Sequence, residues 1–400
     1  MTHADPGADA SSAHPTVPQR TDPRAVMAQR LPACVQPLLT WLTARPAPGE
    51  PPRHRAAWTY LLEAALWTTL GVLAGALAFS ADTPLAWVLV PVSLVVTTSG
   101  IGQFQILVFH RCAHGNLFAE RAWNRRVGRL TSALLVFKHF DAYQREHMLH
   151  HNFKKLLTDE DEFADFVLGM LALGPRMHKR ELWRRVLLAV ASPVFHLRFL
   201  ARRVQASWLS GDRVHNAVGI GAWLLATAAC AWADVLGPFL LLWVLPVTVL
   251  LQLAIVGRVL IEHRFPAAEV IAARGKAFIC HATAGVVAGS MPPSERADSV
   301  RGLLAWSAWW ADMLTLQLLA RLVVLVGDAP CHDFHHRRPS SNRWTDYIHA
   351  RQDDVDAGCP GFPVNYHDQW GLVHAIDDNL ATLARTPHEA LRPVAAAAAA

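Results

Sequence analysis

The chain carries little charge for its length. Only 17% of its 400 residues are charged, whereas 52% are hydrophobic. A soluble domain of this size ordinarily carries more charge, so the composition favours a membrane protein. The six cysteines contain no CxxC pair. This absence argues against a zinc ribbon or a disulfide framework and predicts free thiols in a reducing compartment.

A signal-peptide pattern is also missing, because no apolar run follows a basic start in the first 50 residues. The region is rich in Pro, Ala and Arg, so we expect residues 1–50 to be a mobile cytoplasmic arm. At the other end, residues 351–400 are expected to form a cytoplasmic segment that ends in a low-complexity alanine tail. The net charge of +5 suits contact with anionic lipid headgroups or an acidic carrier, and no nucleic acid partner is expected.

Four apolar stretches are long enough to cross a bilayer, at residues 57–80, 85–109, 214–233 and 236–257. They form two hairpins whose short links, 82–84 and 234–235, contain no Lys or Arg. The arm before the first stretch and the segment 110–213 are basic. The positive-inside rule therefore places both hairpin tips outside and both termini in the cytoplasm.

Three further stretches are apolar but short or interrupted by charge. Residues 165–174 and 183–200 are expected to lie in the membrane interface. Residues 302–327 are expected to form an interfacial or re-entrant helix, with a fifth crossing as the alternative.

Eight of the 21 histidines occur in three short clusters, and a ninth is singled out by its surroundings. His110 and His114 form HxxxH, two later clusters repeat HxxHH, and His263 stands alone in IEHRF. Residues at i, i+3 and i+4 share one helical face, so each cluster can direct its imidazoles at one point. Imidazole is a common ligand of iron, zinc and copper. The predicted metal ligands are His110, His114, His147, His150, His151, His263, His332, His335 and His336.

The predicted topology places all nine on the cytoplasmic side. With that arrangement, HRCAHGNLF, REHMLHHNF and CHDFHHRRP resemble the three histidine boxes of the membrane fatty acid desaturase and hydroxylase superfamily, and IEHRF resembles its extra ligand element. The resemblance covers roughly residues 57–345. It implies an all-α integral membrane fold, with four transmembrane helices in two hairpins and a cytoplasmic helical cap that carries the boxes.

The resemblance also implies the chemistry. Residues 51–350 would hold a non-haem centre of two iron ions that uses O2 to remove hydrogen from a fatty acyl chain, linked to a lipid or an acyl carrier. The sequence shows no His-Pro-Gly-Gly haem signature and no flavin fingerprint, so a separate ferredoxin- or rubredoxin-type donor is expected. The protein is expected to lie in a bacterial-type membrane, either an inner membrane or a cell membrane.

The chain departs from the family pattern in two places. Arg111 stands where the first box often has an acid, and Arg337 and Arg338 follow the third box in place of an apolar pair. The two arginines predict contact with an anionic group, either on the substrate or on lipid phosphate. Glu146, Glu262 and Asp333 are candidates for orienting the histidines, whereas the acidic run 159–162 is expected to be solvated.

Two alternatives use the same histidines. A hydroxylase, ketolase or acetylene-forming enzyme would share the site, because the outcome depends on where the chain lies. A membrane zinc hydrolase or metal carrier belongs to another class, but zinc hydrolases need about three ligands. Carriers place polar ligands within their crossings, and here the predicted crossings hold only Glu63 as a charged residue.

Overall fold

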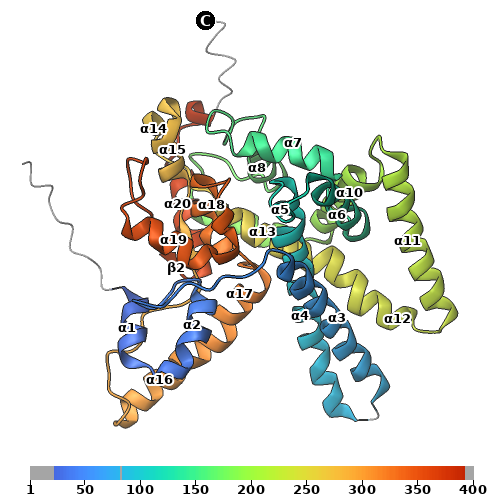
Figure 1. Cartoon of the computed structure of the whole chain (residues 1–400), viewed down its shortest axis with the longest axis horizontal. Helices are drawn as coiled ribbons and strands as arrows, with labels where there is room; N and C mark the ends of the chain where they lie inside the picture. Colours follow the sequence, from blue (N-terminus) through green and yellow to red (C-terminus); the bar gives the residue numbers. More distant parts are fainter. Residues whose placement is uncertain (1–21, 82, 392–400) are drawn as a thin grey trace, which may run out of the picture.

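The computed structural model describes residues 22–81 and 83–391, and these residues are mostly helical (Figure 1). Four helices are long and apolar enough to cross a membrane: Trp58–Ser80, Pro84–Ala113, Arg213–Trp232 and Leu236–Glu262. They coincide with the four predicted crossings. The fourth continues to Glu262, past the predicted end at residue 257, and so includes Arg258. In Figure 1 these helices are α3 (Trp58–Ser80), α4 (Leu89–Gln103) with α5 (His110–Ala113), α11 (Arg213–Trp232), and α12 (Leu236–Phe239) with α13 (Leu251–Glu262).

Helices α3 and α4 pack closely side by side (Figure 1). A side chain on Gly71 would collide with Thr97, and one on Gly100 with Thr68. Such small-residue contacts are typical of helix pairs in membranes, where packing rather than water exclusion holds helices together. The opposite side of α3 exposes a row of leucines, which fits contact with lipid: Leu62, Leu66, Leu70, Leu73 and Leu77.

Two of the long helices contain π-helical turns. One, Phe104–Phe109, directly precedes His110, and two others, Leu240–Val244 and Pro246–Leu250, lie in the fourth long helix. A π turn shifts the direction in which later side chains point and is frequent at functional sites. Here it sets the angle at which His110 leaves its helix.

The segment between the second and third long helices forms a helical layer: α6 (Arg121–Leu135), α7 (Phe140–His150), α8 (Glu162–Ala164), α9 (Lys179–Ala191) and α10 (Pro193–Trp208). Residues 183–200, predicted to be interfacial, fall in α9 and α10. Phe195 and Phe199 of α10 pack in one buried cluster with Leu260 and Ile261 of α13. This cluster fixes the helical layer against the end of the fourth long helix.

The last third of the chain folds beside that layer as α14 (Ala268–Ala273), α15 (Gly275–Ala282), β1 (Gly285–Val287), α16 (Val300–Asp312), α17 (Leu318–Val323), α18 (His332–Arg337), α19 (Tyr347–Asp356), β2 (Asp368–Trp370) and α20 (Leu372–Arg385). Strands β1 and β2 pair in parallel, with Gly285 opposite Asp368. The predicted domain boundary at 350/351 falls inside α19. The C-terminal segment is therefore packed into the same body through this small sheet.

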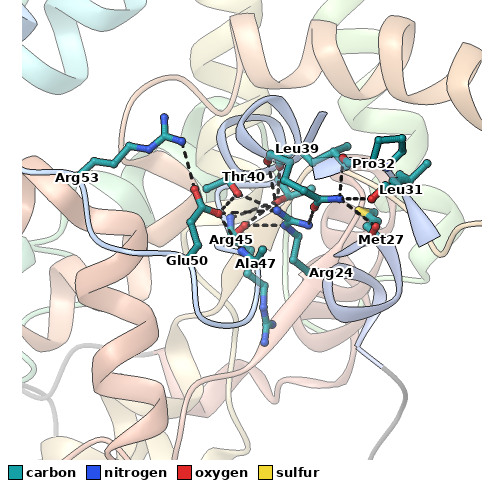
Figure 2. Close-up of polar contacts among 12 residues, drawn as sticks. Arg24, Met27, Leu31, Pro32, Leu39, Thr40, Arg45, Ala47, Glu50 and Arg53 are labelled. Carbon is teal, nitrogen blue, oxygen red and sulfur yellow. Dashed lines mark hydrogen bonds and ion pairs between the residues drawn. The ribbon is translucent and has the colours of Figure 1, made fainter. Parts of the chain in front are cut away.

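The second half of the region predicted to be a mobile arm is folded. It forms α1 (Pro23–Arg30) and α2 (Gln36–Thr43), whose Met27, Leu39 and Leu42 pack on Trp309 of α16. Arg24 is fully buried, and Figure 2 shows its guanidinium among carbonyl and hydroxyl partners, including Oγ1 of Thr40 at 2.8 Å. Residues 1–21 of the predicted arm, and the alanine tail within 392–400, lie outside the described residues.

Candidate metal centre

The first histidine box sits at the end of the second long helix. Nδ1 of His110 lies 3.1 Å from the carbonyl oxygen of Ile106, which can only accept, so Nδ1 carries the proton. Nε2 of His110 therefore keeps its lone pair and faces His335, 2.9 Å away. His114 follows at the end of α5. The helix and its π turn thus present both imidazoles to the same space.

The second box ends helix α7. His147 is buried and stacks on Tyr143 with ring centroids 5.2 Å apart. His150 directs Nδ1 at Oδ1 of Asp161 over 2.8 Å, which leaves its Nε2 free to bind a metal. His151 caps the helix beside His147.

The third box forms the short helix α18, and His263 directly follows α13. His332, His335 and His336 lie on one face of α18. Asp333 lies on another face and pairs with Arg351 through two hydrogen bonds of 2.7 and 2.8 Å. This buried ion pair fixes α18 on the side of the helix that faces away from the three histidines.

All nine predicted histidines come together in two groups. In each group the ligand nitrogens lie within 4.8 Å of one another. The first histidine group contains His110, His114, His147, His151 and His335. The second histidine group contains His150, His263, His332 and His336. The groups adjoin, since the rings of His151 and His336 stack with centroids 4.4 Å apart.

The nitrogen spacing fits one ion in each group. Nε2 atoms are separated by 2.9 Å between His114 and His147, and by 3.0 Å between His147 and His151. In the second group, His263 lies 2.9 Å from His150 and 3.3 Å from His332. Two nitrogens bound at right angles to one ion, at about 2.1 Å each, lie about 3.0 Å apart. The observed spacings are compatible with nitrogens that share a metal ion.

The electrostatics agree with this arrangement. Burial lowers the pKa of His114 and of His332 to about 3, and it lowers the pKa of His147, His151, His263, His335 and His336 well below the ordinary value. Neutral imidazoles then face one another with lone pairs. Both ring nitrogens of buried His336 lack a hydrogen-bond partner among the described residues. Converging lone pairs repel unless a cation lies between them, so the residues fit the metal that they are predicted to hold.

His150 is the exception. Burial alone would lower its pKa, but the carboxylate of Asp161, together with those of Glu262 and Glu162, outweighs burial and raises it. Asp161 is almost fully buried and also accepts from the backbone N–H of Leu157 and Phe163. The acidic run 159–162 was expected to be solvated, and for this residue that expectation is wrong. No spacing rule singles out one acid of such a run, although its position before a short helix fits an N-cap.

The three carboxylates predicted to orient histidines have other partners. Glu146 pairs with Lys138, Asp333 with Arg351, and Glu262 lies 3.8 Å from Nε of Arg258. Cys112 and Cys331 lie beside the first and third boxes in sequence, but neither belongs to a histidine group. Burial raises the pKa of the Cys331 thiol to about 12, which keeps it protonated.

The arginines that depart from the family pattern are occupied within the protein. Arg111 pairs with Asp328 and lies over the ring of Trp344. Arg337 donates to the carbonyl of Val364, and Arg338 binds Asp354. Both hold the segment 354–365 on α18. The expectation of contact with a substrate anion or lipid phosphate is wrong for Arg337, which is buried, and stays a prediction for the partly exposed Arg338.

A cavity of about 260 Å³ opens beside both groups. Its walls include members of the first histidine group (His110, His147, His335) and of the second (His150, His332). Apolar side chains such as Phe109, Phe163 and Phe199 line much of the rest. Such a space, mostly apolar and adjacent to polar groups, is typical of a small-molecule site.

Comparison with known proteins places this site in a family. The chain matches the fatty acid desaturase family over residues 85–292, just over half of its length. The match includes the first two boxes and His263, and the fold brings the third box to them from beyond it. No curated protein and no solved structure matches the chain. With its four membrane-length helices, the chain is therefore an integral membrane oxidoreductase of the fatty acid desaturase family.

Proposed function

We propose that this protein is a membrane-bound di-iron enzyme that uses O2 and external electrons to desaturate a fatty acyl chain. The observation that carries the proposal is the pair of adjoining histidine groups, with nine nitrogens in total, beside an apolar cavity. The proposed iron ligands are the nine histidines of the two groups. Zinc hydrolysis needs about three ligands at one ion, so nine exceed its needs.

When bound, the two irons would supply activation of O2 for removal of hydrogen from an unactivated C–H bond. The chain's own residues orient the ligands and exclude water. Ile106 and Asp161 fix the tautomers of His110 and His150. Phe109 and Phe163 give the cavity an apolar wall beside the ligands, which keeps competing water away from the reacting carbon.

We also propose that the boxes and both termini face the cytoplasm, as the positive charge of residues 110–213 favours. A ferredoxin- or rubredoxin-type protein would then deliver electrons from that side. The helix over residues 300–323 would lie in the interface or re-enter the membrane, because its Val300, Leu303 and Leu304 are exposed.

The test is expression of the full chain in a host with a compatible reductase, with mass spectrometry of the free, lipid-linked and carrier-linked acyl pools. Loss of two hydrogens supports desaturation, and gain of one oxygen identifies the hydroxylase alternative, which would use the same histidines. Metal analysis of the purified protein should give about two irons per chain. A single zinc instead would contradict both forms of the proposal.

A further inference from the structure

The cavity beside the histidine groups contains a buried arginine whose donors are only partly used. Arg258 lies on α13, is 3% exposed and lines the cavity together with Gln105. Its Nη2 donates to Oε1 of Gln105 over 2.7 Å, and its Nε lies 3.8 Å from Glu262. Among the described residues, nothing accepts a hydrogen bond from Nη1. Gln105 therefore engages the guanidinium at Nη2 and Glu262 lies near Nε, while Nη1 of this cavity-lining residue has no acceptor among the described residues.

The other cations of the cavity wall are already satisfied. Arg203 donates to the carbonyl oxygens of Leu135, Val136 and Val247. Lys138 is held between two glutamates at the more exposed side of the cavity. Arg258 is therefore the cation of this wall, within the described part of the chain, that has a donor left for a ligand.

The location of Arg258 strengthens this argument. It lies within a helix of membrane-crossing length. A charged side chain in such a helix is costly and ordinarily marks a substrate or ion site. A buried donor without an acceptor is costly as well. Both costs fall when an anion binds at Nη1.

We propose that Arg258 binds the carboxylate of a free acid substrate, so that the acid's chain lies against the histidine groups. The guanidinium group matches a carboxylate in shape and charge. A thioester or glycerol ester carries no charge at that position. The inference rests on the proposed function, and it replaces the expected lipid- or carrier-linked chain with an unesterified acid as the substrate.

The size of the cavity limits the acid. At about 260 Å³, it lies below the range of about 300–1,000 Å³ that drug-sized ligands occupy. Arg258 and the histidines line the same small space. The reacting carbon therefore lies near the carboxylate, which indicates a short- or medium-chain acid.

The experiment measures binding to the full-length, iron-loaded protein in detergent. Radiolabelled octanoate, laurate and palmitate, each with its primary amide, are compared by equilibrium dialysis. At least one acid should bind more tightly than its amide. Arg258→Met should weaken binding of that acid by about tenfold to a hundredfold, the effect of losing a hydrogen bond to a charged group. Its amide should bind as before.

Two further variants make the result decisive. Arg202→Met removes an exposed arginine that pairs with Asp165 on the outside of α10, and it should leave acid binding unchanged. If Arg258→Met does not fold, Gln105→Leu should still weaken binding of the acid and not of the amide, because it removes the support of Nη2. Arg258→Lys should recover part of the affinity.

The outcomes separate this inference from the proposed function. Equal affinity for acids and amides, or no acid binding by the iron-loaded wild type, overturns the inference while the iron content still supports the proposed function. A protein without iron that binds the acid through Arg258 leaves the inference standing and removes the proposed function. Equal weakening of acid and amide in Arg258→Met also counts against a carboxylate site.

Discussion

The two histidine groups differ in how their imidazoles are held. The first has five nitrogens, and its His110 is oriented by donating a hydrogen bond to a backbone carbonyl, that of Ile106, in the π turn before His110. The second has four nitrogens and is oriented by a buried carboxylate, that of Asp161. One group therefore relies on helix geometry and the other on a charged side chain. Because the second group has fewer ligands, we expect it to lose its metal ion more easily when one ligand is removed.

The largest expected effect comes from removing a ligand of the second group. His263→Ala leaves three nitrogens there, so the iron content should fall from about two ions per chain to about one, with loss of activity. His114→Ala leaves four nitrogens in the first group and should retain more iron. Iron per chain is measured by mass spectrometry of the purified proteins, with His281→Ala, at an exposed histidine outside both groups, as the control. Equal losses in the two variants would show that ligand number does not distinguish the groups.

The next largest effect is expected from Arg351→Met, which should lower the iron content of both histidine groups together. Arg351 is buried and pairs with Asp333, which lies on the helix that supplies His332 and His336 to one group and His335 to the other. Arg351→Met leaves a buried carboxylate unpaired, which typically costs about 3–5 kcal/mol. We expect a lower thermal midpoint and parallel loss of both irons.

The control for this change is Arg202→Met, since Arg202 pairs with Asp165 at the surface. Exposed pairs contribute about 0–1 kcal/mol, so its thermal midpoint should hardly move. Loss of iron from one group alone in Arg351→Met would contradict the view that α18 is held as one unit.

The difference between the groups could be predicted only in part from the sequence. Histidine spacing singled out eight of the nine residues because helical periodicity brings i, i+3 and i+4 onto one face, and the resemblance of IEHRF added His263. Apolar length identified the four long helices. The division of the histidines between two groups depends on which helices come into contact in the folded chain, and local spacing in the sequence does not reveal those contacts. His150 and His151 are neighbours in sequence yet belong to different groups.

Charged residues were harder to assign than histidines. The sequence does not distinguish Asp161 from the other acids of its run, which are exposed or partly exposed. Arg258 lay beyond the predicted end of the fourth crossing, because a hydropathy criterion stops where charge begins. Residues 22–50 were expected to be mobile because they are rich in Pro, Ala and Arg. Arg24 is nevertheless buried there, because folding brings it partners such as the carbonyl of Arg45.

A smaller and more selective effect is expected from the carboxylate itself. Asp161→Asn keeps the size of the side chain but weakens its hold on Nδ1 of His150. Loss of such an orienting partner typically costs about 10–100-fold in metal affinity, here at the second group alone. Titration with a chelator should release one iron earlier than in the wild type, whereas Asp159→Asn, at an exposed neighbour in the same run, should behave as the wild type. Early release of both irons would mean that Asp161 supports the whole site.

The smallest expected effect is on the pH dependence of the metal-free protein. With the pKa of His114 lowered to about 3, this histidine stays neutral in the folded chain but takes up a proton below about pH 6.5 when unfolded. The unfolded state then binds more protons, so stability falls as pH decreases through this window. His150 has the opposite sign, because its pKa is raised: its contribution is complete below about pH 6.5 and is lost as pH rises through the raised pKa.

Thermal midpoints of chelator-treated variants between about pH 7.5 and about pH 5.5 therefore separate the groups. The midpoint of His114→Gln should fall less than that of the wild type on acidification, because one source of proton uptake by the unfolded chain is gone. The midpoint of His150→Gln should fall more, because the folded state has lost a site that binds a proton beside Asp161. Identical slopes in the two variants would mean that the carboxylate does not set the second group apart, and the contrast between the groups would then reduce to the number of their ligands.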